Sequence, residues 1–206
     1  MKPWSSIGPF LFLLTFAGCV VLFHLCNAAL LPLAAGALTM RAGEVANLLI
    51  AACIIGPQIV VAVLSPAAAT AAERWGRRPV MLLGFAALPL RAVVFAGSAD
   101  PTLVVAAQLL DGVSGAAFGV LLPLIAADLT AGSGRFNLCL GLLGLATGLG
   151  ATFSTILAGW LATEASVHAA FLALTTAGVA AVFAVALAMP ETRGTGAWRA
   201  APPGAG

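Results

Sequence analysis

Three ionisable residues, His24, Arg91 and Asp111, lie inside long apolar stretches of this sequence. An ionised side chain within a bilayer costs at least about 2.5–3.5 kcal/mol, so such residues pair with one another or serve a function. A carboxylate or an imidazole can also change charge by taking up a proton. Two interpretations stay open for each. Arg91 and Asp111 form a structural ion pair, or Asp111 belongs to a coupling site; His24 couples protons, or it is an interhelical hydrogen-bond partner.

A second group of charges is concentrated in residues 73–78, Glu-Arg-Trp-Gly-Arg-Arg, which Pro79 follows directly. Four charges in six positions are conspicuous in a chain of which only 8% is charged. Such a cluster lies in water or at the lipid headgroups, and basic connections stay on the cytoplasmic side of a membrane. The simplest interpretation is therefore that this charge cluster only marks a membrane boundary. It accounts for Arg77 and Arg78 better than for Glu73 and Gly76, because an acidic residue and a turn-forming glycine add nothing to topology.

The elements that carry these residues are predicted to be membrane-spanning helices. The chain is 62% hydrophobic, and about 20 apolar residues cross a bilayer as a helix. We expect an all-α integral membrane domain over residues 1–193, with six spans at about 8–36, 46–70, 79–98, 102–128, 138–162 and 168–189. Residues 194–206 are expected to form a disordered cytoplasmic tail.

Six spans place both termini on one side, and the basic residues indicate which side. The inner segments would carry seven basic residues and the outer loops one, Arg41. The inner seven are Lys2, Arg74, Arg77, Arg78, Arg135, Arg193 and Arg199. Under the positive-inside rule both termini are cytoplasmic, and the expected location is the plasma (bacterial inner) membrane, crossed several times. Interaction with nucleic acid is not expected, because no basic patch is interleaved with aromatic residues.

The sequence contains a repeat with an offset of 91 residues. Residues 30–39 read LLPLAAGALT and residues 121–130 read LLPLIAADLT, with seven of ten positions identical. The same offset carries the first three predicted spans almost onto the last three. Three spans reverse direction across a membrane, so the pattern predicts two inverted three-helix repeats, at about 8–98 and 99–189. Such repeats are typical of secondary transporters, whose substrate sites lie near the midplane.

The charge cluster resembles the signature of the major facilitator superfamily, Gly-x-Leu-Ala-Asp-Arg-x-Gly-Arg-Lys, found between the second and third helices of a six-helix half. Residues 69–78 read Ala-Thr-Ala-Ala-Glu-Arg-Trp-Gly-Arg-Arg in that location, with Glu73 in place of the Asp. Residues 190–193, Pro-Glu-Thr-Arg, resemble the closing motif of the family's second half. Gln108 stands where the fourth helix usually has Arg, and the Gly-Pro of the fifth helix is absent. First-half functions tied to those residues therefore do not carry over.

The resemblance implies the C-terminal-type half of a transporter that moves a small solute by alternating access, coupled to an ion such as the proton, without enzymatic activity or cofactor. A parallel homodimer, or a separate N-terminal-type half, would complete the solute path within the lipid bilayer; a fragment of a twelve-helix chain is the other possibility. The family's first and fourth helices line the cavity. The resulting candidates for substrate and coupling contacts are His24, Asn27, Gln108 and Asp111, and Gln58 is added from the second helix. Residues Glu73, Arg74, Gly76, Arg77 and Arg78 would form a gating loop that latches one access state.

Other features have structural or rival explanations. Gly144 and Gly148 form a Gly-xxx-Gly pattern that permits close helix packing. No spacing of the four cysteines fits a metal site, so no metal is expected. Ser114, in Gly-Val-Ser-Gly, resembles the nucleophile motif of rhomboid intramembrane proteases, for which His168 is the candidate base. A membrane assembly or regulatory subunit that transports nothing is the other rival class.

Overall fold

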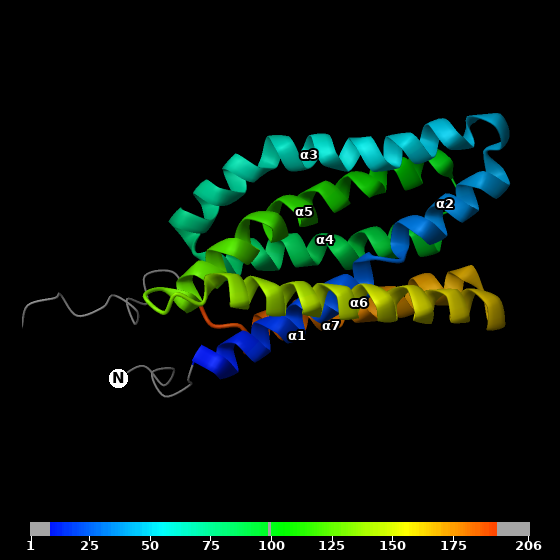
Figure 1. Cartoon of the computed structure of the whole chain (residues 1–206). Coiled ribbons are helices and arrows are strands. Elements are labelled where there is room, and N and C mark those ends of the chain that lie inside the picture. The colour runs from blue at the N-terminus through cyan, green and yellow to red at the C-terminus, as the bar shows by residue number, and fades with distance from the viewer. Residues whose placement is uncertain (1–8, 99, 193–206) are drawn as a thin grey trace, which may run out of the picture.

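The computed structural model describes residues 9–98 and 100–192, and this part of the chain is built from helices. Figure 1 shows them as a long bundle. The helices are α1 (Pro9–Asn27), α2 (Leu30–Arg41), the short 3-10 helix η2 (Gly43–Val45), α3 (Ala46–Trp75), α4 (Arg77–Gly97), α5 (Pro101–Thr130), α6 (Phe136–Glu164) and α7 (Val167–Ala188). The predicted tail and Arg193 lie outside the described residues.

The all-helical membrane fold is confirmed, because six helical segments of the described chain are long and apolar enough to cross a bilayer. The first of them, 11–41, contains both α1 and α2, and the others coincide with α3 to α7, with η2 preceding α3. The connection between the second and third spans is shorter than predicted. Helix α3 continues to Trp75 and α4 begins at Arg77, so only Gly76 separates the two helices. The inverted three-helix repeat stays a prediction.

The first span is interrupted at Ala28 and Ala29. Pro32, in the first turn of α2, has no amide proton to donate to the carbonyl of Ala28, and its ring crowds that carbonyl. The amide of Ala29 donates to the Ser154 hydroxyl of α6 at 3.1 Å, instead of closing a helical bond with Leu25. A polar side chain that satisfies a freed backbone group is what allows a broken helix at membrane depth.

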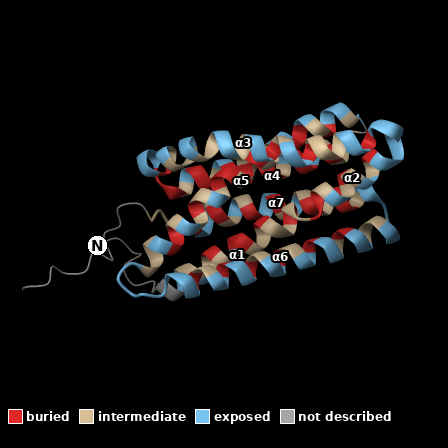
Figure 2. Ribbon diagram, turned by 45° about the horizontal axis from the view of Figure 1, so that its top comes forward, coloured by how far each residue is buried: buried red, intermediate tan, exposed pale blue. Residues whose placement is uncertain are grey.

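Two groups of helices build the bundle. In Figure 1, α5 lies between α3 and α4, while α1 packs against α6 and α7; contacts between α4 and α7 join the groups. Buried residues concentrate where the groups meet, and the outward faces of α3 and α6 are largely exposed (Figure 2). These faces carry large apolar side chains, such as Ile55 and Ile59 on α3 and Leu145 and Ile156 on α6. An apolar exterior with a packed interior suits a helix bundle in lipid.

Closely packed glycines set the helix crossings. A Cβ added at Gly112 of α5 would lie 2.6 Å from the carbonyl oxygen of Pro57 in α3, and one at Gly150 of α6 would lie 2.4 Å from that of Val21 in α1. By contrast, a Cβ at Gly144 or Gly148 would meet no atom within 4 Å. The close crossing predicted for those two glycines is thus not made within the described chain, where α6 uses Gly150 instead.

The four cysteines, Cys19, Cys26, Cys53 and Cys139, are free thiols, each at most 2% exposed. No group of three or more potential metal ligands occurs among the described residues. All four lie in the hydrophobic core, where they pack as small apolar residues.

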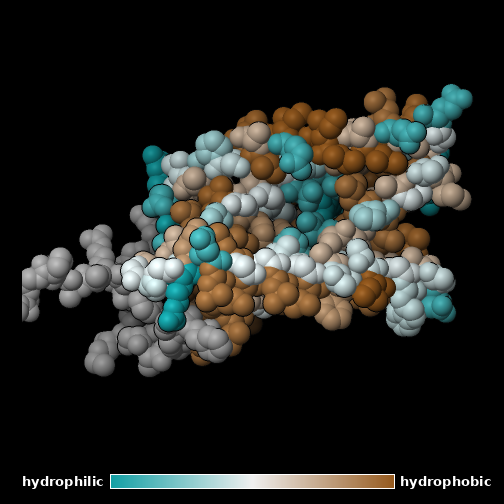
Figure 3. Space-filling view, viewed as in Figure 1, coloured by the Kyte–Doolittle hydropathy of each residue, from teal (hydrophilic) through white to brown (hydrophobic). Residues whose placement is uncertain are grey.

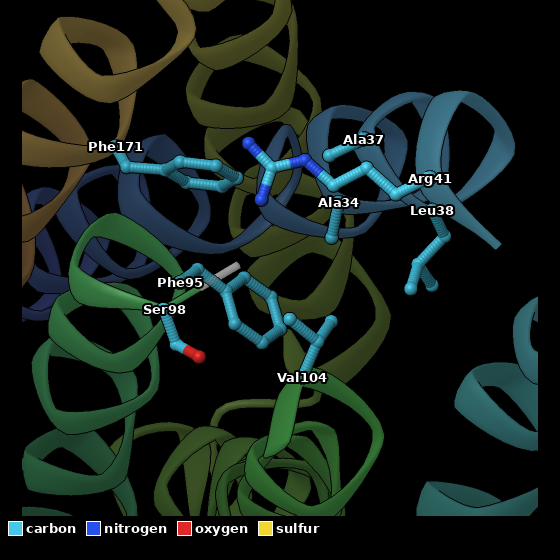
Figure 4. A pocket seen from close by; sticks show the side chains of 8 residues that line it. All are labelled: Ala34, Ala37, Leu38, Arg41, Phe95, Ser98, Val104 and Phe171. Carbon is cyan, nitrogen blue, oxygen red and sulfur yellow. The ribbon is translucent and has the colours of Figure 1, made fainter. Parts of the chain in front are cut away.

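A small cavity of about 20 Å³ lies where α2 meets the ends of α4, α5 and α7 (Figure 4). Its lining is mostly apolar, apart from Ser98 and the guanidinium of Arg41. The lining residues are Ala34, Ala37, Leu38, Arg41, Phe95, Ser98, Val104 and Phe171. None of them is a predicted site residue, and the volume is that of one or two water molecules rather than of a solute.

Candidate functional site

An ion pair between Arg91 of α4 and Asp111 of α5 is the centre of the candidate site. Arg91 Nη1 lies 2.6 Å from Asp111 Oδ1. The Arg91 side chain is 1% exposed, whereas the Asp111 side chain is 28% exposed. The structure therefore brings together the two charges that the sequence offered as a possible ion pair. It buries the cation and leaves the carboxylate partly open.

Two amides complete the surroundings of the guanidinium. Arg91 Nη2 donates to Asn27 Oδ1 at the end of α1, and Nη1 lies 3.5 Å from Gln108 Oε1. Gln108 is fully buried one turn before Asp111. A planar guanidinium can donate to several oxygens at once. We call Asn27, Arg91, Gln108 and Asp111 the intramembrane cluster.

The break after α1 places Asn27 in this cluster. Asn27 is the last residue of α1, so its side chain stands at a helix C-terminus, where the peptide dipoles leave partial negative charge. Arg91 donates to this side chain, which brings its positive charge to the same helix end. Asp111 is therefore not the sole compensation for the buried cation.

His24 lies one turn before Asn27, beside the cluster. Its ring packs against Phe23 and Phe118, with ring centroids 5.2 and 5.1 Å away. The buried Nε2 atom has no hydrogen-bond partner among the described residues. The same holds for Nε2 of Gln108 and Nε of Arg91. Buried polar atoms are seldom left unsatisfied, so this cluster retains capacity for further hydrogen bonds.

Gln58, the remaining candidate, is exposed on α3 and makes no hydrogen bond to the cluster in the described structure. Figure 3 shows hydrophilic surface gathered in a hollow between α3 and α6, about midway along the bundle. This face of the bundle, bordered by α3 and α6, is called the open face below.

The second site is the α3–α4 junction, which comprises residues 73–78. It is two helix ends joined by Gly76 and not the predicted loop, because Glu73, Arg74 and Trp75 form the last turn of α3. Arg77 Nη1 lies 2.7 Å from Glu73 Oε1, and Arg77 Nε lies 3.3 Å from Asp128 Oδ2 of α5. Arg77 also donates to the carbonyl of Ala72 at 3.0 Å. The junction is thereby tied to the end of α5.

Glu191 caps the first turn of α4. Its carboxylate oxygens accept the backbone amides of Arg77 and Arg78, at 2.8 and 3.1 Å. A carboxylate at a helix N-terminus satisfies orphan amides and complements the positive end of the dipole. Gly76 makes room for it, because an added Cβ would lie 2.3 Å from Glu191 Oε2. Its φ of 106° is also outside the range that other residues adopt readily.

The other junction residues extend this network. Arg78 Nη2 donates to the carbonyl of Ala186 in α7, and Thr192 Oγ1 donates to Asp128 Oδ2 at 3.3 Å. Arg74 is exposed on the last turn of α3. The sequence motifs pointed to Glu73, Gly76 and Arg77. The closing Pro-Glu-Thr-Arg motif was the sequence signal that could have identified Glu191 as a functional residue. No sequence signal singled out Asp128 or Ser154.

The protease alternative fails on geometry. Ser114 Oγ donates to the carbonyl of Leu110 in its own helix at 3.2 Å. His168 lies in the first turn of α7, with Nδ1 3.0 Å from the carbonyl of Ala96 in the last turn of α4. Ser114 is thirteen residues into α5, or about 20 Å deeper than the end where α5 and α7 begin. A base at that distance cannot activate the hydroxyl.

Comparison with known proteins agrees with this geometry. The sequence pattern of the Major Facilitator Superfamily matches residues 11–204. Two curated relatives, each described as an uncharacterized MFS-type transporter, come from Mycobacterium tuberculosis strains CDC 1551 / Oshkosh and ATCC 25618 / H37Rv. Each is 39% identical over 180 residues, which is 87% of this chain and 43% of the relative. The chain thus spans less than half the length of these relatives. By the match over nearly all its spans, the chain belongs to the Major Facilitator Superfamily.

Proposed function

We propose that the chain forms one half of a secondary transporter, which moves a small solute by alternating access and couples that movement to protons. The observation that carries this proposal is the asymmetric burial of the Arg91–Asp111 pair. The Arg91 side chain is enclosed, while 28% of the Asp111 side chain is exposed. A titratable group that faces a solute path, with its counter-ion fixed behind it, is suited to proton coupling.

Protonation of Asp111 would remove the negative partner of a buried cation. Removing one partner of a buried ion pair costs about 3–5 kcal/mol when the remaining charge is left uncompensated. Here Arg91 keeps the oxygens of Asn27 and Gln108. The guanidinium would therefore keep two acceptors after protonation of Asp111, which a coupling role requires. Solute would bind beside it, with His24 and Gln58 as further contacts from the open face.

A second six-helix half would cover the open face. The chain spans 43% of its curated relatives, and the hollow between α3 and α6 is hydrophilic (Figure 3). Exposing polar groups to lipid is costly, so a partner that encloses them is favoured. We propose a second copy in parallel orientation or a separate N-terminal-type half. Gly144 and Gly148, which meet no neighbour within the chain, lie on the exposed part of α6 and would allow close approach of that partner.

The α3–α4 junction would act as the latch of one access state. Its network joins α3, α4, α5 and the segment after α7 at one end of the bundle. That end also carries Arg74, Arg77, Arg78 and Arg135, and Arg41 lies at the other end. By the positive-inside rule the latch is cytoplasmic, as are both termini, and the bacterial inner membrane is the proposed location.

Reconstitution of this chain in liposomes loaded with a pH-sensitive dye tests the proposal. Solutes are screened for those that drive proton flux, and Asp111→Asn is compared with Asp100→Asn. Asp100 is a matched control because it caps the same helix outside the membrane, accepting Thr102 N at 2.8 Å, and Asn caps equally well. We expect Asp111→Asn to abolish coupled flux with normal assembly, and Asp100→Asn to retain it. Flux unchanged in Asp111→Asn would refute coupling at this residue.

Chemical cross-linking in the same liposomes tests the proposed second half. Transport by a chain that stays monomeric would contradict it. If no solute moves, and cluster variants act only when another membrane protein is present, the chain is an assembly or regulatory subunit instead.

A further inference from the structure

Ser154 differs from the other hydroxyl residues within the described spans in what its side chain contacts. Ser65 and Ser114 donate to carbonyls four residues earlier in their own helices, at 2.7 and 3.2 Å. Thr155, the neighbour of Ser154, does the same with Ala151 at 3.2 Å. Ser154 Oγ instead accepts the backbone amide of Ala29, across to the other helix, at 3.1 Å. Both residues are buried, at 0% and 2% exposure, so water does not compete for this bond.

The crossing of α6 with α1 brings Ser154 to this place. One turn earlier on α6, Gly150 lies so close to α1 that an added Cβ would be 2.4 Å from the Val21 carbonyl oxygen and 2.9 Å from His24 Cβ. The two helices run in the same direction, so one turn further along α6 corresponds to the end of α1. The Ser154 hydroxyl is therefore held against the break by backbone packing.

The proline alone does not make the break. Residues 121–130 match 30–39, including the proline, yet α5 continues through Pro123 without interruption. At the offset of 91 residues, Asn27 corresponds to Phe118 and Ser154 corresponds to Val63. The continuous helix thus lacks both polar side chains that serve the broken one. Of these two side chains, Ser154 accepts a backbone amide that a continuous helix would pair internally, so the comparison points to Ser154 as the partner that supports the break.

We propose that Ser154 is a positioning residue for the intramembrane cluster. By accepting the Ala29 amide it holds the chain out of the helical path directly after Asn27, and so keeps Asn27 Oδ1 against the Arg91 guanidinium. This inference rests on the proposed coupling role of Asp111 for its consequence in transport, but not for its structural part. Without the hydroxyl, the Ala29 amide loses this acceptor, and the break is no longer held in place. The chain after Asn27 would then be free to shift, which would move Asn27 away from Arg91.

The structural part is tested by hydrogen exchange and by a double-mutant cycle on the whole chain in detergent. An interhelical hydrogen bond in a membrane protein corresponds to about a 3- to 20-fold change in an equilibrium constant. We expect Ser154→Ala to raise amide exchange in a peptide spanning 28–33 by that factor, with Thr155→Ala as the matched control that leaves it unchanged. If Ser154 acts through Asn27, adding Asn27→Ala to the Ser154→Ala variant should change the thermal unfolding temperature little further. Unchanged exchange in Ser154→Ala, or additive losses, would overturn the proposal.

The functional part uses the pH at which solute-coupled proton flux is half-maximal. Asp111 pairs with Arg91 on α4, and the titratable groups that interact electrostatically with this pair are His24 and Cys26 on α1 and Cys53 on α3. Because both Ser154→Ala and Asn27→Ala take the Asn27 oxygen away from Arg91, the two variants should move the midpoint by the same amount. Thr155→Ala should not move it. An unchanged midpoint in Ser154→Ala would refute the positioning role, whereas absence of flux in every solute tested would refute the proposed transport and leave the exchange result to decide on Ser154.

Discussion

Replacement of Gly76 by Ala is expected to disrupt the junction through two separable effects. The first is backbone strain, because φ of 106° and ψ of 168° lie in a region occupied almost only by glycine. Adopting it with a side chain costs about 1–3 kcal/mol. The second is a collision, since the new Cβ would lie 2.3 Å from Glu191 Oε2 and 2.6 Å from its Cδ.

The collision is relieved only if the Glu191 carboxylate moves off the start of α4. Two hydrogen bonds to a charged acceptor would then be lost, at 2.8 and 3.1 Å in the native arrangement. Each such bond contributes about 1.5–3 kcal/mol, so the lower bound for both is about 3 kcal/mol. Together with strain, Gly76→Ala should destabilise the fold by about 4 kcal/mol or more.

A double-mutant cycle with Glu191→Ala separates the two effects. In that background the carboxylate is already absent, so Gly76→Ala should add only its strain, about 1–3 kcal/mol. Gly132→Ala is the matched control for strain alone, because Gly132 has φ of 75° but no atom within 4 Å of an added Cβ. Unfolding in detergent can be followed with a fluorogenic thiol reagent, because the four cysteines are buried in the fold. Strictly additive losses for Gly76→Ala and Glu191→Ala would refute this account of the junction.

Three further outcomes are expected. Gly112→Ala should lower the free energy of unfolding by about 1–3 kcal/mol, because the new Cβ would press on the Pro57 carbonyl oxygen. Gly148→Ala should leave the free energy of unfolding unchanged. Equal shifts of the two variants in a thermal scan would contradict the helix crossings described above. Asp128→Asn should destabilise the fold more than Glu73→Gln in the same scan. The reason is that the Glu73 side chain is 63% exposed, and exposed ion pairs contribute at most about 1 kcal/mol. The reverse order of destabilisation would count against the junction network. The four buried cysteines should not react with a membrane-permeant maleimide in the folded chain, and should react after addition of SDS. Mass spectrometry measures the labelling. Rapid labelling of the folded chain would argue against the burial of these residues.

The sequence was sufficient for those features that depend on local pattern. Hydropathy predicted six spans, and the rarity of charges within them singled out Arg91 and Asp111 as possible partners. The sequence made no prediction for backbone groups whose partners come from distant residues. The carboxylate that caps α4 belongs to Glu191, 114 residues after Arg77, and the acceptor at Ala29 is 125 residues away in Ser154. The Gly-xxx-Gly spacing predicted that α6 could approach a neighbouring helix closely. Which glycine lies at the contact depends on the rotation of α6 about its axis, and in the structure it is Gly150.

The single-residue connection between α3 and α4 has a mechanical consequence. A flexible loop would let two helices change their mutual tilt freely, but here every such change must be absorbed by the φ and ψ of Gly76 or by bending the helices themselves. Arg77 bonds back across the joint to Ala72 and Glu73, and Glu191 holds the amides that follow it. A change of tilt between α3 and α4 would therefore have to break contacts of this network. A rearrangement at this end of the bundle would thus involve both helices together.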